Sequence, residues 1–257
     1  MDLGLRGRTA IVCASTGGLG EAVARALADE GANVVVSGRR GQRARQVAAE
    51  LPQALAVEVD LISTDGPARL FTAAMDAFGA VDVLVLNGPG PAPGSAAEIT
   101  AYGVDQAIHT LVRPQQQLVS LALPGMRALG WGRILALGSS GVVAPLPNLA
   151  LSNLGRAALA GYLKTLAAEV AGDGVTVNML LPGRIATDRV AALDRASAER
   201  QGLPVEQVQA NSRQSIPAGR YGRVDEFGAV GAFLCSEQAA YVTGIAMRCD
   251  GGLVRSL

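Results

Sequence analysis

The chain has 257 residues, of which 49% are apolar and 17% are charged, and its 22 basic residues balance its 22 acidic ones. This length and apolar content predict a substantial buried core, and scattered charges with a net value of zero argue against nucleic acid or an anionic membrane surface as a partner. No apolar run reaches membrane-spanning length and the N-terminus has no apolar signal core, so we expect a cytoplasmic protein.

Short apolar strands alternate with helical patterns along the chain. Expected strands cover residues 9–14, 33–37, 54–59, 81–86, 133–137, 175–180 and 243–249. Expected helices cover residues 21–30, 38–51, 65–78, 101–129, 152–170 and 224–235. Pro114 and Pro124 should kink or break the longest helical region. The pattern predicts a Rossmann-type doubly wound α/β fold, with a parallel sheet of about seven strands and helices on both faces.

No linker or repeat divides the sequence, so residues 1–257 are expected to form a single domain. Residues 182–217 are the one long excursion, polar and alanine-rich with weak helical patterning. An excursion at the carboxyl end of a strand lies over the ligand crevice in this architecture, which predicts a mobile lid at about 183–217. Cys13, Cys235 and Cys249 are far apart and lack metal-ligand spacing, so we expect buried, reduced thiols and no metal site.

The first strand leads into the glycine-rich stretch Ser15-Thr-Gly-Gly-Leu-Gly20, which opens the first helix. Strand, glycine turn and helix in this order are typical of a dinucleotide site, because the glycines admit a pyrophosphate to the backbone and the helix N-terminus favours anions. An ordinary tight turn is the alternative. The next strand ends in Ser37-Gly38-Arg39-Arg40, with no acidic residue for a ribose hydroxyl. Two guanidinium groups favour a 2′-phosphate, so NADP(H) is the predicted cofactor, unless the arginines are merely solvated.

Several motifs, in order and over the whole length, resemble the short-chain dehydrogenase/reductase superfamily, in particular its 3-oxoacyl-acyl-carrier-protein reductase-like branch. The matching segments are Cys13-Ala14-Ser-Thr-Gly17-Gly18-Leu-Gly20, Asn87-Gly-Pro-Gly90, Gly132-Arg-Ile134, Val177-Asn-x-x-x-Pro-Gly183 and Asp250-Gly-Gly252. The resemblance implies a homotetramer or homodimer and a small-molecule or acyl-carrier-bound substrate. With the turn and the arginine pair, it implies cofactor contacts from Ala14, Ser15, Gly17, Gly18, Leu19, Gly20, Arg39, Arg40, Asp60, Leu61, Asn87, Gly88, Arg156, Pro182, Gly183 and Thr187.

The catalytic pattern of this family is broken here. Its enzymes use a Tyr-x-x-x-Lys pair, a serine thirteen residues before the Tyr, and an upstream asparagine. Ser139 matches the serine, but Ser152 and Arg156 stand at the Tyr and Lys positions and Leu111 stands near the asparagine position. An aliphatic hydroxyl is a far weaker acid than a phenol with a pKa of about 10, and Arg does not shuttle protons. A helix N-cap is the alternative role for Ser152, and Arg156 is kept as a cofactor or anion contact.

Another group must then supply a proton. His109, the one histidine of the sequence, lies near the missing asparagine and titrates near neutrality, although a lone histidine on a long helix is usually structural. A water held by Ser139, Ser140 and Ser152 is a further candidate, whereas Tyr102 and Tyr162 are expected to be packing residues.

The sequence therefore predicts an NADP(H)-dependent oxidoreductase acting on a carbonyl/alcohol pair with non-standard proton transfer. Its catalytic candidates are Ser139, Ser152, Arg156 and His109. The alternatives are a cofactor-binding pseudoenzyme or sensor, and an isomerase, lyase or cyclase that reuses the same pocket.

Overall fold

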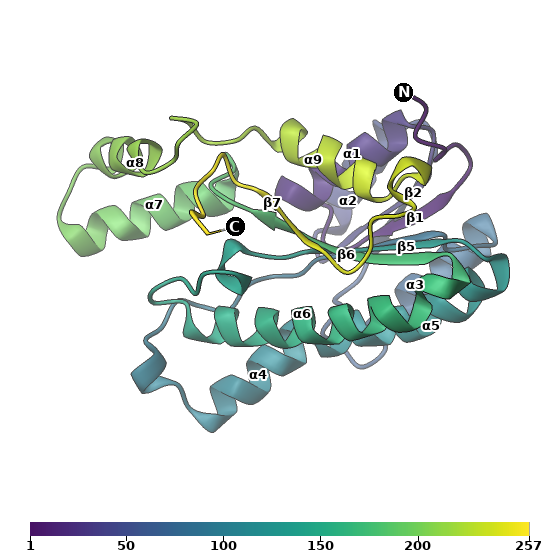
Figure 1. The fold of residues 1–257 in the computed structure, drawn as a ribbon, viewed down its shortest axis with the longest axis horizontal. Coiled ribbons are helices and arrows are strands. Elements are labelled where there is room, and N and C mark those ends of the chain that lie inside the picture. The colour runs from purple at the N-terminus through teal and green to yellow at the C-terminus, as the bar shows by residue number, and fades with distance from the viewer. Residues whose placement is uncertain (257) are drawn as a thin grey trace.

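The computed structural model describes residues 1–256, and its centre is one parallel sheet of seven strands (Figure 1). The strands are β1 (Thr9–Val12), β2 (Asn33–Gly38), β3 (Ala54–Glu58), β4 (Val83–Leu86), β5 (Gly132–Leu137), β6 (Val175–Pro182) and β7 (Ala246–Cys249). Their order is β3-β2-β1-β4-β5-β6-β7, and every neighbouring pair is parallel. This confirms the predicted Rossmann-type fold.

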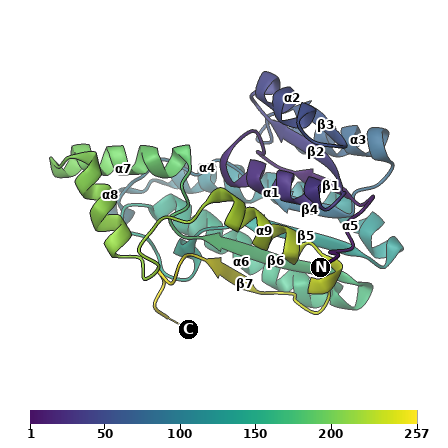
Figure 2. The same ribbon diagram turned by 90° about the horizontal axis from the view of Figure 1, so that it is seen from above.

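Helices cover both faces of the sheet (Figure 2). They are α1 (Gly18–Asp29), α2 (Gly41–Ala49), α3 (Gly66–Phe78), α4 (Ala101–Leu111), α5 (Arg113–Leu129), α6 (Ala150–Val170), α7 (Asp188–Gln201), α8 (Val205–Gln214) and α9 (Val224–Leu234). One face packs against α1, α2 and α9, and the other packs against α3, α5 and α6. No helix within residues 1–256 is long and apolar enough to cross a membrane.

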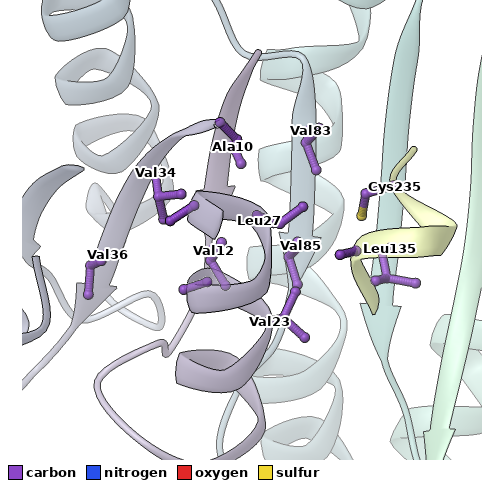
Figure 3. Close-up of a cluster of buried hydrophobic side chains, with 14 of the residues drawn as sticks. Ala10, Val12, Val23, Leu27, Val34, Val36, Val83, Val85, Leu135 and Cys235 are labelled. Carbon is purple, nitrogen blue, oxygen red and sulfur yellow. The ribbon is translucent and has the colours of Figure 1, made fainter. Parts of the chain in front are cut away.

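Most strand residues are apolar because helices cover both faces of the sheet. Figure 3 shows the core on one face, where Val12 and Val85 of the sheet meet Val23 and Leu27 of α1. Ile11, the neighbour of Val12, points into the core on the opposite face. Full burial of such a side chain contributes roughly 1.5–3 kcal/mol. These two cores fix the strands in place, so the carboxyl ends of the strands lie along one edge of the sheet.

Several element boundaries differ from those expected. The helical region 101–129 is two helices that separate at Val112, because Pro114 occupies the first turn of α5, where its missing N–H needs no partner. Pro124, in contrast, lies inside α5 without ending it. Helix α6 starts at Ala150 and Leu149 is its N-cap residue, so the alternative role of Ser152 as an N-cap is wrong. The last strand begins at Ala246 rather than at residue 243.

The excursion after β6 contains two helices, α7 and α8, which extend beyond the carboxyl ends of the strands (Figures 1 and 2). Its anchors are polar. Arg184 Nη1 donates to Asp194 Oδ1 over 2.8 Å, and the Tyr221 hydroxyl donates to the other oxygen of the same carboxylate over 2.9 Å. Helices α7 and α8 confirm the weak helical patterning of this excursion. They lie beyond the carboxyl ends of the strands, where a lid would lie (Figures 1 and 2). Its mobility stays a prediction.

Candidate active site

A cleft of about 920 Å³ opens at the carboxyl ends of the strands. It lies where β1 and β4 adjoin, the point at which the strand order reverses and where open α/β sheets bind their ligands. Its walls come from the glycine turn, the end of β2, the proline-rich loop after β4, the start of α6 and the segment from Pro182 to Arg200. The volume is within the usual range for a small-molecule or cofactor site.

The glycine turn is shaped by residues that do not themselves reach the cleft. The Ser15 hydroxyl is fully buried, donates to the Val12 carbonyl over 2.7 Å and accepts from the Ser37 N–H over 2.9 Å. A Cβ on Gly20 would lie only 2.6 Å from the Ala14 carbonyl oxygen. Neither Ser15 nor Gly20 lines the cleft, and both have structural roles in the turn, so cofactor contacts at these two residues stay predictions.

The other expected contacts do line the cleft. These are Ala14, Gly17, Gly18, Leu19, Arg39, Arg40, Asp60, Leu61, Asn87, Gly88, Arg156, Pro182, Gly183 and Thr187. No side chain caps the N-terminus of α1, so the N–H groups of its first turn stay open to an anion. The fit to a dinucleotide is therefore supported by the open turn as well as by the size of the cleft.

The two arginines after β2 differ in their contacts. Arg40 is held over the turn, since its Nη2 donates to the Thr16 carbonyl over 2.7 Å and to the Thr16 hydroxyl over 3.1 Å. Arg39 is exposed. Within residues 1–256, the acidic residues that line the cleft are Asp60 and Asp188, and neither belongs to β2 or to the arginine pair that follows it. This corner is therefore cationic, as a 2′-phosphate would require.

Ser139, Ser152 and Arg156 come together at the end of β5. The Ser139 hydroxyl oxygen accepts from the Gly141 N–H over 3.1 Å, and the Ser152 hydroxyl oxygen accepts from Arg156 Nε over 3.4 Å. Arg156 Nη1 also donates to the carbonyls of Leu137 and Gly138, over 3.1 and 3.3 Å. Both serine oxygens thus act as acceptors within the protein, which leaves their own O–H protons free to donate into the cleft.

Burial lowers the pKa of Arg156 below its usual value, and the positive charge of Arg189 lowers that pKa further. A guanidinium remains protonated in proteins in spite of such shifts. Arg156 is thus a fixed cation rather than a proton carrier.

His109 is not brought to this site. It is half-buried on α4, and its neighbour Thr110 lines the cleft instead. Tyr162 packs partly buried against the core, as expected, but the expectation for Tyr102 is wrong because 72% of it is exposed. No tyrosine, histidine, lysine or cysteine of residues 1–256 lines the cleft. The proton-bearing side chains that line it are therefore hydroxyls, amides, carboxyls and guanidinium groups.

The lining residues that the sequence reasoning missed include Thr16, Gln115 and Arg189. Gln115, only 3% exposed, donates from Nε2 to the Asn87 carbonyl over 3.3 Å and stiffens the loop after β4. Nothing in the sequence near Gln115 signals this role. Arg189 also lines the cleft, and its position two residues after Thr187 could have revealed it.

The family model described as "Enoyl-(Acyl carrier protein) reductase" matches residues 13–254. The chain belongs to the short-chain dehydrogenase/reductase superfamily. It is 34% identical to the D-beta-hydroxybutyrate dehydrogenase of Cupriavidus necator, over 97% of this chain and 99% of that protein. It is 30% identical to the 3-oxoacyl-[acyl-carrier-protein] reductase of Aquifex aeolicus, over 98% of this chain and 100% of that protein.

The crystal structure of L-sorbose reductase from Gluconobacter frateurii, solved with NADPH and L-sorbose, is similar with a TM-score of 0.93, 30% identity and full coverage of both chains. The resemblance read from the motifs is thereby confirmed at the level of the superfamily. Ser152 and Arg156 stand at the Tyr and Lys positions of this short-chain dehydrogenase/reductase.

Proposed function

We propose that the protein is an NADP(H)-dependent oxidoreductase that interconverts a carbonyl and an alcohol, with proton transfer through serine hydroxyls and bound water instead of a tyrosine. One observation carries the cofactor part. The cleft at the strand switch point combines an uncapped α1 N-terminus with the guanidinium groups of Arg39 and Arg40, which line it at the end of β2. The named activities of the relatives support the reaction class, since one is a hydroxy acid dehydrogenase and another reduces L-sorbose with NADPH.

The chain offers a residue for each part of the cofactor. The N–H groups at Gly18 and Leu19 would bind the pyrophosphate, and Arg39 and Arg40 would bind the 2′-phosphate. By resemblance, Asp60 and Leu61 would lie at the adenine and Thr187 at the nicotinamide amide. The nicotinamide, when bound, supplies or accepts the hydride.

Ser139 and Ser152 would polarise the substrate oxygen. Each hydroxyl already accepts one hydrogen bond, from Gly141 N–H and from Arg156 Nε respectively, so each has its own proton available for that oxygen. Donors fixed toward the place where negative charge develops lower the barrier to reaction. A water held by Ser139, Ser140 and Ser152 would relay the proton from bulk solvent to that oxygen, because neither an aliphatic hydroxyl nor a water molecule is acidic enough to be the source of the proton.

The test has two stages. NADPH and NADH are first titrated by fluorescence, and NADPH oxidation is then followed with a panel of β-ketoacyl thioesters and small ketones. We expect tighter binding of NADPH than NADH, and turnover of at least one compound. Equal affinity for the two cofactors would contradict the role of the arginine corner. Tight NADPH binding without any turnover would instead support the pseudoenzyme or sensor, for which the lack of a tyrosine in the cleft is the favouring observation.

The missing phenol can be tested directly. The double substitution Ser152→Tyr and Arg156→Lys should raise ketone reduction if proton transfer limits the rate. No gain would mean that the pocket serves other chemistry, such as isomerisation. Light scattering in solution would test the proposed homotetramer or homodimer.

A further inference from the structure

Two guanidinium groups converge on one point at the reacting end of the cleft. A Cβ on Gly90 would lie 3.8 Å from Arg156 Nη2 and 3.8 Å from Arg189 Nη2, so the two nitrogens are separated by no more than twice that distance. Arg156 comes from α6, Arg189 from the first turn of α7, and Gly90 from the loop after β4. The missing side chain of Gly90 leaves the space between the two guanidinium groups open.

No carboxylate neutralises this pair. Within residues 1–256, neither Arg156 nor Arg189 has an acidic oxygen within 4.0 Å. Asp188, next to Arg189 in sequence, is exposed and forms no such contact. Arg184, which also lines the cleft, does have an acidic partner, because its Nη1 lies 2.8 Å from Asp194 Oδ1. Placing two like charges close together in a partly buried site costs free energy, and a bound anion would offset that cost.

The cofactor phosphates have other partners. On the proposed function, the pyrophosphate would lie at Gly18, whose Cβ would be 3.8 Å from Thr187 Cγ2, and the 2′-phosphate would lie at Arg39 and Arg40. Arg156 is instead tied to the Leu137 and Gly138 carbonyls, one helical turn from Ser152. The arginine pair therefore faces the substrate side, next to the hydroxyl that would polarise the reacting oxygen.

We propose that Arg156 and Arg189 together bind a carboxylate of the substrate, so that the protein acts on a small oxo acid and the corresponding hydroxy acid. An N–H group of Arg156 would bind one oxygen of the carboxylate and an N–H group of Arg189 would bind the other, through charge-assisted hydrogen bonds of about 2.8 Å. The same pair would also attract a phosphate, so inorganic phosphate is one of the probes in the test. The inference rests on the proposed function and adds the substrate class to it.

The experiment measures binding to the protein loaded with NADP⁺, by calorimetry. The probes are 2-oxobutyrate and 3-oxobutyrate, the methyl ester of each acid, and inorganic phosphate. We expect saturable binding of at least one acid and at least tenfold weaker binding of its ester. Arg189→Gln should weaken binding of that acid at least tenfold and leave the NADPH affinity within about twofold, and Arg189→Lys should recover part of the loss. Arg195→Gln, on the same helix but outside the cleft, is the matched control and should change neither affinity.

Several outcomes would overturn the assignment: equal binding of acid and ester, no binding of either acid at millimolar concentration, stronger binding of phosphate than of the acids, or unchanged acid binding by the Arg189→Gln variant. If that variant loses NADPH affinity as strongly as acid affinity, the pair belongs to the cofactor, and the assignment also fails. A failure of the proposed function looks different, because the native protein would then either not bind NADPH or bind it without turning over any carbonyl compound, whereas the acid-binding measurement requires no turnover.

Discussion

The Gly20→Ala substitution tests whether the glycine turn is built by close backbone contact. The added Cβ would lie 2.6 Å from the Ala14 carbonyl oxygen, and it would lie 2.9 Å from Asn87 Nδ2. Ordinary contact begins at 3.4 Å, so the backbone of the turn must move by 0.8 Å away from α1. Overpacking of this kind costs about 1–3 kcal/mol of unfolding free energy.

The same movement should weaken the cofactor site. Gly18 and Leu19 lie within two residues of the clash, and their N–H groups are the proposed donors to the pyrophosphate. A hydrogen bond to a charged group contributes about 1.5–3 kcal/mol. The loss of one such bond raises the dissociation constant of NADPH roughly 10- to 100-fold.

Urea unfolding and a fluorescence titration with NADPH measure the two effects separately. Gly172→Ala is the control, because a Cβ at this exposed position meets nothing within 4 Å. It should change stability by no more than about 0.5 kcal/mol. If Gly20→Ala behaves like the control in both assays, the close contact at the turn has no energetic role and the reasoning is refuted.

Three further changes probe other parts of the molecule. Replacing Arg39 and Arg40 together by Ala should reduce the preference for NADPH over NADH about tenfold or more in fluorescence titrations, because each phosphate contact contributes about 1.5–3 kcal/mol. Arg133→Met should lower the unfolding free energy in urea by about 3 kcal/mol, since this arginine is 2% exposed and donates to three backbone carbonyls. Burial raises the pKa of Cys13 and of Cys235 to about 12, so iodoacetamide at about pH 8 should label these thiols only after unfolding, as mass spectrometry would show.

Both arginine substitutions have a matched control. Lysine in place of both Arg39 and Arg40 keeps the charge and should retain part of the preference for NADPH. Arg45→Met removes an exposed arginine whose nearest acidic oxygen is 3.9 Å away, and it should leave stability nearly unchanged. Rapid labelling of native Cys13 would contradict its burial, and equal effects of the Arg133 and Arg45 variants would contradict the role of the buried carbonyl contacts.

The fold was predictable because local sequence and tertiary environment agree in this chain. Strand β4 is apolar at every position and β1 at every position but Thr9, which is the signature of burial on both faces. The glycine turn marks where the first strand meets its helix. Boundaries were less predictable. Ser152 has the chemistry of an N-cap, but α6 begins two residues earlier, because the cap residue is chosen by the path of the preceding chain rather than by side-chain type alone.

The residues of the site were predictable only where the backbone of the fold fixes their positions. Positions in the turn and at strand ends are fixed by the fold, so Gly17, Gly18 and Asn87 line the cleft as expected. His109 was proposed from its proximity in sequence to a missing catalytic position, but helix phase decides whether such a residue faces the cleft, and Thr110 takes that place. Gln115 belongs to a helix three residues beyond the break at Val112, and a break of this kind resets the helix phase.

The Ser152 and Arg156 replacements are best understood as one coupled change rather than two. Arg156 Nε donates to the Ser152 hydroxyl while Nη1 is held by the end of β5, so the guanidinium orients the serine and is itself fixed. A lysine at residue 156 has one nitrogen and cannot make these contacts together with one toward Gly90. A tyrosine beside the native arginine would lack a freely placed ammonium group to lower its pKa. Ser152→Tyr alone or Arg156→Lys alone therefore breaks the Ser152–Arg156 arrangement without creating a Tyr–Lys pair. The effects of the two single substitutions on activity should not add up to the effect of the double variant.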